Sequence, residues 1–453
     1  MSSGEDRDSR VPSRAMTGWT VGLVCVAIVA GGVIVGGLLH EREPELTTKP
    51  VPASTTATPP VDTSYATPPV VFPVAIPGCA VVEPPSDGAT MGFAASASGY
   101  DNPKYPWFSG PKAVVMSQAL RDVLPGAVEV PFASVDHSLF FGPIFDPPTE
   151  PGKSVDFGGW TTASGELLRG GKAGDLMVSV RQSTAPIPPC VAGDLDERRH
   201  RADGTIVDVH DTWHEVGKVR TLSRTARAYL ADGSAVTAYA TDNGQDGSSH
   251  SGTVPLTVDD LAAIVTAPGL RVTTPVPPGT PDVPESCGAG SDAGAVIDQA
   301  AAHRLDAVLA RIPLDGLTLD RPLGQLRPPG FDGNGVCQVV RVTTPGRQSR
   351  LSVAIAAGQR LPEESAAVSS PDGERVTTRR QPDGAVVQSR ESRTTRSPNE
   401  PGMPSISETM RTVTITRRSG AQVQVSSTAE GSIEPLPFEQ LEAIAVTPGL
   451  EVS

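Results

Sequence analysis

Two segments of this chain, 180 residues apart, share one pattern of apolar and helix-ending residues. Residues 255–272 (PLTVDDLAAIVTAPGLRV) and residues 435–452 (PLPFEQLEAIAVTPGLEV) are identical at nine positions. The identical positions form an apolar stripe at helical spacing, followed by a Pro-Gly pair that ends the helix. No catalytic constellation is repeated with them. The sequence therefore predicts that one folding unit is present twice.

The segments that precede these two helices also recur in the same order. Each unit begins with a helical apolar pattern and continues with alternating apolar and polar residues, which predict strands, around Asp-Gly or Ser-Gly turns. The matching strand segments are residues 176–182 and 351–357, 202–211 and 382–391, and 227–240 and 414–427. We therefore expect each unit to be a helix, an antiparallel meander of four or five strands, and a closing helix on one sheet face. This is an α+β fold.

Proline-rich segments divide the chain. Residues 273–286 contain five prolines and separate a first repeat, residues 79–272, from a second repeat, residues 287–453. Residues 40–78 are rich in proline and threonine and have almost no periodic apolar pattern. Such a composition favours extended, polyproline-like conformations. We therefore expect residues 40–78 to form a linker that holds the two repeats away from the N-terminal region.

The N-terminal region contains a long uncharged apolar segment. Residues 15–39 carry no charge, and 25 residues of helix are long enough to cross a bilayer. Arg10 and Arg14 precede the segment, so the positive-inside rule places a tail, residues 1–14, in the cytoplasm and the repeats outside. The sequence predicts a single-pass signal anchor in the plasma membrane. A cleaved signal peptide is the alternative, although no A-x-A site follows the apolar run.

Five cysteines agree with an extracytoplasmic location. Cys25 lies in the apolar segment, which leaves Cys79, Cys190, Cys287 and Cys337, an even number for an oxidising compartment. Three pairings are possible. The simplest joins the two cysteines within each repeat, because each repeat then closes within itself.

Composition and motifs exclude several classes of function. Asp and Glu outnumber Lys and Arg by 51 to 37, and this net charge of −14 argues against nucleic-acid binding. The chain has no P-loop, no G-x-G-x-x-G segment after a strand, and no G-x-S-x-G motif. Cysteine pairs at zinc-ligand spacing are also missing. We therefore predict no cofactor, no metal and no catalytic residue.

Three polar clusters have a simpler structural interpretation. His210 and His214 would share a helix face, but their β-branched surroundings predict a strand, on which they lie about 13 Å apart and cannot share one metal ion. The loop that begins at Asp242 resembles a calcium loop only in part, because Thr253 stands where a bidentate Glu is needed. Nine arginines between residues 375 and 418 are consistent with a solvated sheet face. Binding to anionic wall polymers or lipid headgroups is the alternative.

Aromatic residues are scarce in this chain but gather in two segments of the first repeat. Proline and glycine interrupt both segments, residues 100–111 and 138–147, and predict loops. The two loops contain Tyr105, Trp107, Phe108, Phe140, Phe141 and Phe145. Aromatic loops on a rigid sheet can form a groove for a peptide or a sugar; alternatively, they fold back and seal the core. Both interpretations remain open at this point.

The closing pattern PL-x4-L-x-A-I, followed by PGL, resembles the C-terminal segment of uncharacterised actinobacterial membrane-anchored proteins. The resemblance implies a short cytoplasmic tail, one transmembrane helix, a stalk and an extracytoplasmic part, and it carries over no catalytic residue. The sequence thus favours a membrane-tethered extracytoplasmic module that binds or organises an envelope polymer or protein. A cell-envelope hydrolase with its site near His137 and the aromatic loops is the alternative.

Overall fold

The computed structural model describes most of both repeats. It covers residues 64–85, 96–97, 99–146, 158–244, 247, 249–288, 294–314, 316–330, 333–344, 347–363, 368–369, 374–396 and 405–452. Within these residues no helix has the length and apolar character needed to cross a membrane. The predicted tail, residues 1–14, and the predicted span, residues 15–39, lie outside the described ranges.

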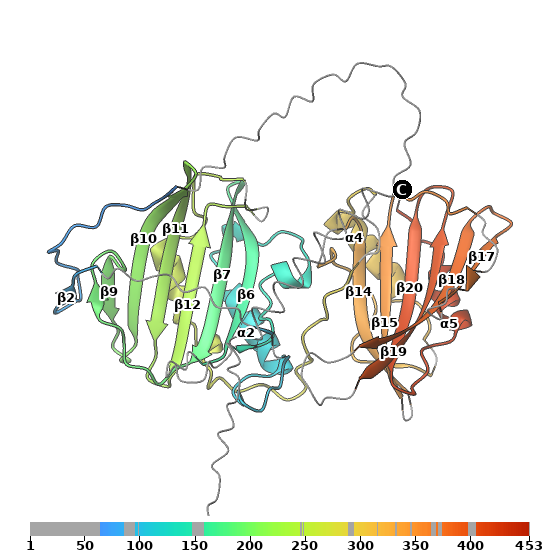
Figure 1. Cartoon of the computed structure of the whole chain (residues 1–453), viewed down its shortest axis with the longest axis horizontal. Coiled ribbons are helices and arrows are strands. Elements are labelled where there is room, and N and C mark those ends of the chain that lie inside the picture. Colours follow the sequence, from blue (N-terminus) through green and yellow to red (C-terminus); the bar gives the residue numbers. More distant parts are fainter. Residues whose placement is uncertain are drawn as a thin grey trace, which may run out of the picture. The chain divides into compact units, whose positions relative to one another are not determined.

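The first repeat is built on a broad antiparallel sheet (Figure 1). Its main strands follow the spatial order β6-β7-β12-β11-β10-β9. These are β6 (Trp160–Arg169), β7 (Lys172–Gln182), β12 (Ser234–Thr241), β11 (Val219–Tyr229), β10 (Ile206–Val216) and β9 (Glu197–His200). Short strands extend the edges or pair with each other: β1 (Tyr65–Ala66), β2 (Val82–Glu83), β3 (Ser96–Ala97), β4 (Val128–Glu129), β5 (Phe145–Asp146) and β8 (Cys190–Val191).

The second repeat has the same strand order. Its sheet runs β14-β15-β20-β19-β18-β17, with β13 and β16 at its ends. The strands are β13 (Thr318–Leu319), β14 (Val336–Thr344), β15 (Arg347–Ala356), β16 (Val368–Ser369), β17 (Arg375–Arg380), β18 (Val386–Arg396), β19 (Ile406–Thr416) and β20 (Gln422–Glu430). The register also agrees, because Val178 pairs with Ala238 in the first sheet and Val353 with Val425 at the corresponding point of the second.

The predicted α+β fold class is wrong, because regular structure in the described residues is mostly β-sheet. Their α-helices have 8 to 14 residues: α2 (Gly110–Val123), α3 (Val258–Val265), α4 (Gln299–Leu309) and α5 (Phe438–Ala445). The turns η1 (Val135–His137) and η2 (Pro268–Leu270) are 3₁₀-helical. These helices have about two to four turns, whereas most of the main strands extend for 8 to 11 residues.

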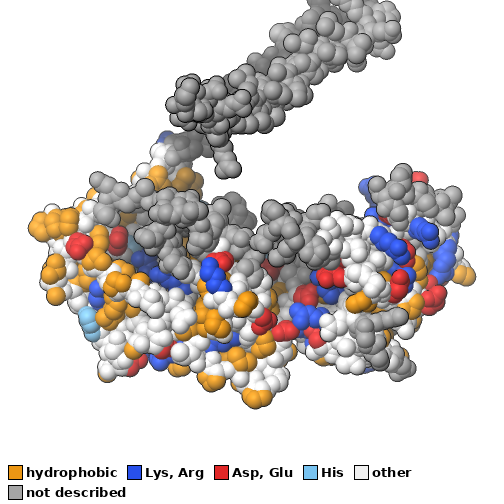
Figure 2. All heavy atoms as spheres, turned by 60° about the horizontal axis from the view of Figure 1, so that its bottom comes forward, with side chains coloured by type: hydrophobic (Ala, Val, Ile, Leu, Met, Phe, Trp, Pro, Cys, Tyr) orange, Lys and Arg blue, Asp and Glu red, His pale blue; other side chains and the backbone are white. Residues whose placement is uncertain are grey.

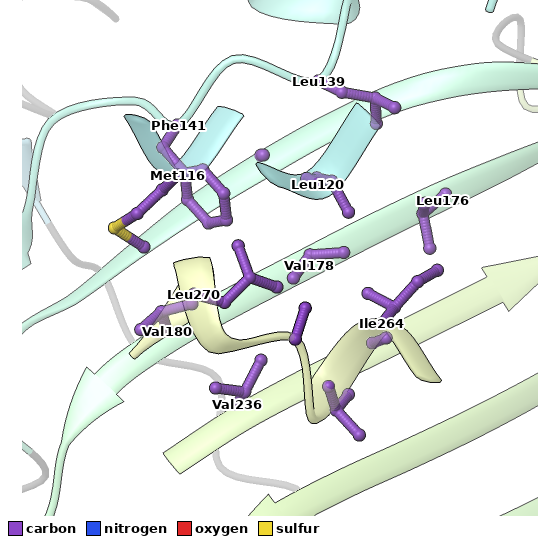
Figure 3. Close-up of a cluster of buried hydrophobic side chains, with 14 of the residues drawn as sticks. Met116, Leu120, Leu139, Phe141, Leu176, Val178, Val180, Val236, Ile264 and Leu270 are labelled. Carbon is purple, nitrogen blue, oxygen red and sulfur yellow. The ribbon is translucent and has the colours of Figure 1, made fainter. Parts of the chain in front are cut away.

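The core of the first repeat lies between the sheet and its helices. Figure 3 shows apolar side chains of α2, β7 and the α3–η2 segment turned towards one another. Met116, Leu120, Val178, Ile264 and Leu270 are all buried there. In Figure 1 the yellow closing helix lies behind strands β10 to β12. None of the α-helices in the described ranges packs on the opposite face of this sheet. We call that opposite face the outer face.

The closing helix is held in the same way in both repeats. Leu261 and Leu441 are fully buried at equivalent positions. Arg224 donates to the Leu256 carbonyl at 2.9 Å and to the Asp211 carboxylate at 2.8 Å. Its counterpart in the second repeat, Arg411, donates to the Pro435 carbonyl at 3.2 Å and to the Glu391 carboxylate at 2.7 Å. Each arginine therefore clips the start of its closing helix to the inner face of its sheet.

Each repeat contains one disulfide. Cys79 is bonded to Cys190 across 111 residues, and Cys287 is bonded to Cys337 across 50 residues. These are the pairs that the cysteine spacing predicts. The first bond fixes the segment that enters the first repeat, and the second fixes the segment that enters the second.

Candidate ligand-binding site on the first sheet

The outer face of β6 and β7 presents side chains suited to binding. Along β6, Thr161, Ala163 and the following odd-numbered residues point into the core, so that Trp160 and Thr162 point outwards. On the neighbouring strand Met177 is 44% exposed. Strand alternation therefore places an aromatic ring, a thioether and hydroxyl groups on one uncovered surface.

A cavity of about 800 Å³ lies against this surface. Its walls come from the outer face of β6 and β7, the two aromatic loops, the segment that joins the repeats, and one arginine of β14. The aromatic side chains that line it are Tyr100, Phe140, Phe141, Phe145 and Trp160. This volume falls within the usual range of small-molecule sites. We call it the aromatic cavity.

Backbone bonds to the edge of β6 position the second aromatic loop. The Leu139 amide donates to the Ser164 carbonyl at 3.0 Å, and the Gly142 amide donates to the Thr162 carbonyl at 2.9 Å. At the end of the loop Phe145 pairs with Trp160, and their rings are stacked with centroids 6.1 Å apart. The second aromatic loop thus pairs with β6 as an additional edge strand would, and this pairing positions its aromatic side chains.

The rim of the aromatic cavity is acidic. Asp101, Asp136, Asp282 and Glu285 line it together with a single cation, Arg341. Arg341 donates to Asp282 at 2.7 Å and to Glu285 at 2.9 Å. Four carboxylates and one guanidinium leave a formal charge of −3. Such a rim favours neutral or cationic ligands that carry hydrogen-bond donors.

Tyr100 contributes a neutral hydroxyl to this cavity. Burial, reinforced by the nearby Asp136 carboxylate, raises the pKa of Tyr100 well above its ordinary value. The hydroxyl donates to the Phe141 carbonyl at 3.2 Å, which fixes its direction. Tyr100 therefore remains protonated at physiological pH, and its oxygen is an acceptor.

The structure divides the predicted aromatic residues into two groups. Tyr105 and Phe108 are buried in the core, at 7% and 2% exposure, and Trp107 packs against them while partly exposed. Phe140 and Phe141 line the aromatic cavity, although Phe141 is itself fully buried. The first loop thus seals the core, with Tyr100 as its cavity residue, whereas the second loop contributes to both.

Sequence reasoning missed Tyr100, Trp160 and Met177. Trp160 and Met177 lie outside the aromatic loops: Trp160 is on β6, for which no strand was predicted from the sequence, and Met177 is on a predicted strand whose outward residues were not considered. The available signal was a large apolar residue at an outward position of an alternating strand. That signal becomes visible once the neighbouring strand and the register are known.

The histidines give no support to the hydrolase alternative. His137 follows the cavity residue Asp136, but it is not one of the residues that line the aromatic cavity. His210 lies on β10 with its Nδ1 3.3 Å from an Asp196 carboxylate oxygen, and His214 stacks on Tyr65. Among the described residues, these three histidines do not meet an acid and a hydroxyl in one cavity.

The segment around His210 has one counterpart in the second repeat. Asp211 corresponds to Glu391, and each of these acids accepts from the arginine that clips the closing helix of its repeat. Three other arginines of the second repeat are also paired: Arg379 with Glu442, Arg390 with Glu374 and Arg417 with Glu451. On the face drawn in Figure 2, basic and acidic side chains lie next to one another. Arg390 agrees with the solvated-face interpretation. Arg411 and Arg379 instead contact the closing-helix segment, so they belong to the face that the helix covers.

Comparisons with known proteins identify no family. No family model matches the chain, and no curated protein matches it. A match among solved structures is the di-domain ARO/CYC StfQ from the steffimycin biosynthetic pathway, at 10% identity over 75% of this chain and 86% of that chain. Its TM-score is 0.13, too low to carry an argument about fold or function.

Proposed function

We propose that this chain is a non-catalytic binding module outside the plasma membrane, tethered through residues 15–39, and that the aromatic cavity holds its ligand. One observation carries the assignment of the site. In matching register, Trp160 corresponds to Gly335 and Met177 to Ser352. The second repeat forms the same sheet without these large outward side chains, so the fold does not require them. Exposed apolar groups that a fold does not require are candidates for binding.

The lining favours a ligand with apolar ring faces and many donors. Aromatic rings pack against the C–H faces of sugars or against apolar side chains, and the acidic rim accepts hydrogen bonds from hydroxyl or ammonium groups. We therefore propose an envelope polymer that carries hydroxyl or amino groups. The extracytoplasmic location is supported by the apolar segment, the positive flank and the two disulfides.

Binding is testable with the full-length chain in detergent micelles. Fragments of envelope polysaccharide and peptidoglycan are titrated while tryptophan fluorescence is recorded. We expect saturable binding that Trp160→Ala weakens about tenfold, because an aromatic contact contributes about 1.4 kcal/mol. The matched control is Met410→Ala, which removes a side chain that is 36% exposed on the outer face of β19 in the second repeat.

The outcomes separate the alternatives. Equal affinity of the wild type, Trp160→Ala and Met410→Ala for the ligand would show that the ligand does not bind in the aromatic cavity. No saturable binding of any envelope fraction would reject the binding function. Release of new reducing ends or free amino groups from the fragments would instead favour the hydrolase alternative.

The tether is tested separately. We expect the full-length chain to remain in the membrane fraction after high-salt and carbonate washing, whereas a chain lacking residues 1–39 is released. Protease added to intact cells should cleave the wild-type chain. Protection in intact cells together with cleavage in lysed cells would contradict the extracytoplasmic orientation.

A further inference from the structure

A second cavity lies on the outer face of the first sheet. It has a volume of about 480 Å³, and Trp160 lines both it and the aromatic cavity. The other lining residues are Ser179, Arg181, Pro188, Arg227, Ala228, Tyr229, Ala235 and Thr237. Its two charged side chains, Arg181 and Arg227, are both cationic, in contrast to the acidic rim of the aromatic cavity.

Strand register places the two arginines on opposite sides of a shallow trough. Arg181 of β7 pairs with Ala235 of β12, and Arg227 of β11 pairs with Thr237 of β12. Adjacent strands are about 4.8 Å apart, so β7 and β11 lie about 10 Å apart with β12 between them. Because Ala235 and Thr237 are small, the floor is low and both long arginine side chains can reach one anion above it.

Both guanidinium groups lack a partner among the described residues. Asp208 lies directly across from Arg227, but it is nearly buried and its two oxygens accept from Arg198 Nε at 2.6 Å and Arg198 Nη2 at 2.8 Å. That pair is neutral, which leaves the charges of Arg181 and Arg227 uncompensated. Arg224 and Arg411, which clip the closing helices, are by contrast paired with carboxylates.

Aromatic groups complete this cavity. Burial, together with the charge of Asp208, raises the pKa of Tyr229, so its hydroxyl stays protonated and can donate. Trp160 contributes a ring at the opposite edge of the cavity. Two planar, five-donor guanidinium groups and a phenol hydroxyl match the oxygens of a carboxylate or phosphate, while the rings pack against an attached ring.

The second repeat provides an internal comparison. In matching register Arg181 corresponds to Ala356, Arg227 to Thr414 and Tyr229 to Thr416. The same sheet therefore forms without any of these three groups. Packing of the sheet therefore does not require Arg181, Arg227 and Tyr229 to occur together in the first repeat.

We propose that this second cavity is an anion-binding site for a carboxylate or phosphate ester attached to a ring. The anion lies between Arg181 and Arg227, and the attached ring packs against one of the two aromatic side chains at the edges of the cavity, Trp160 or Tyr229. The proposal does not rest on the ligand of the aromatic cavity, because its charged groups belong to the second cavity alone.

The test uses the full-length chain in detergent micelles with three probes: inorganic phosphate, phenyl phosphate and benzoate. We expect isothermal titration to show binding of phenyl phosphate and benzoate, with an affinity that falls as salt is added. Inorganic phosphate should bind at least fivefold more weakly than phenyl phosphate. Arg181→Gln and Arg227→Gln should each weaken phenyl phosphate binding at least tenfold, whereas Arg181→Lys should retain part of it.

The matched control is Arg390→Gln, which removes an outward arginine of the second sheet. Its binding should equal that of the wild type, and all variants should show the wild-type unfolding midpoint. No binding of phenyl phosphate or benzoate to the wild type would overturn the proposal. An equal loss of phenyl phosphate affinity in Arg181→Gln and Arg390→Gln would overturn it as well. Equal affinity for phosphate and phenyl phosphate would overturn the role of the rings.

Discussion

A lysine buried in the first repeat should make the stability of that repeat depend on pH. Lys112 of α2 is only 2% exposed, and its ammonium group donates to the Arg271 carbonyl at 2.8 Å and to the Thr274 carbonyl. Both acceptors belong to the segment that follows the closing helix. Burial lowers the pKa of Lys112 from 10.5 to about 8, and Asp232 opposes this only in part.

The sign and the size of the effect follow from that pKa. Below pH 8 the lysine is protonated in both states, and the folded state carries the full cost of burying the charge. Between pH 8 and 10.5 the unfolded chain binds more protons than the folded one, so the free energy of unfolding rises with pH. The shift of about 2.5 pH units corresponds to about 3 kcal/mol at 1.36 kcal/mol per unit.

The assay exploits the distribution of tryptophan. Of the four tryptophans, Trp107, Trp160 and Trp213 lie in the first repeat and the second repeat has none, so fluorescence during urea unfolding reports the first repeat. We expect the difference in unfolding free energy between the wild type and Lys112→Met to change by about 3 kcal/mol from pH 7.5 to 10.5, in favour of the wild type at high pH.

The matched control is Lys172→Met, because Lys172 is exposed and donates to a Thr253 hydroxyl at 3.0 Å. Its difference from the wild type should stay flat over the same range, since the ammonium group of Lys172 lies in solvent in the folded state as it does in the unfolded chain. A flat difference for Lys112→Met as well would refute the reasoning about burial. A change of opposite sign would mean that the two carbonyls stabilise the charged form more than burial opposes it.

Three further predictions concern the repeats. Leu441→Ala should cost 2–5 kcal/mol, because this fully buried side chain of α5 leaves a cavity; hydrogen exchange of α5 that stays protected would contradict it. Replacing Cys287 and Cys337 with alanine should cost about 4 kcal/mol in the chain-entropy model for a loop of 50 residues, and an unchanged urea midpoint of the second repeat, followed by circular dichroism, would speak against it. Thr257→Ala should cost about 1 kcal/mol because it removes the capping box of α3, and Thr257→Ser should restore most of the tryptophan-monitored stability.

The duplication was predictable because both copies of the unit share the same local sequence patterns. The buried Leu261 and Leu441, the strand alternations and the hairpin turns all depend on neighbours close in sequence. The strand order and register then followed the same plan in both copies. The fold class was predicted wrongly because pattern alone gives too much weight to helices: α3 and α5 have only eight residues each, and the long strands dominate the described chain.

The candidate site was predictable only in part. The aromatic loops stood out by composition, and Phe140 and Phe141 do line a cavity. Which rings seal the core and which face the cavity depends on where the loop meets the edge of β6, and that contact joins residues distant in sequence. No local sequence pattern therefore indicated that Tyr105 and Phe108 are buried in the core.

The sequence by itself determined the repeated unit and the apolar segment at residues 15–39, because each is a pattern along the chain. It favoured one disulfide within each repeat, and the structure shows that pairing. Only the tertiary structure decided which side chains lie together in the two cavities. It placed Trp160 and Met177 on an uncovered sheet face and brought Arg181 and Arg227 across β12. Antiparallel pairing brings Trp160, Arg181, Ala235 and Tyr229, which lie on four different strands, into one row. The composition of a sheet face is therefore decided by register and cannot be read from any one strand.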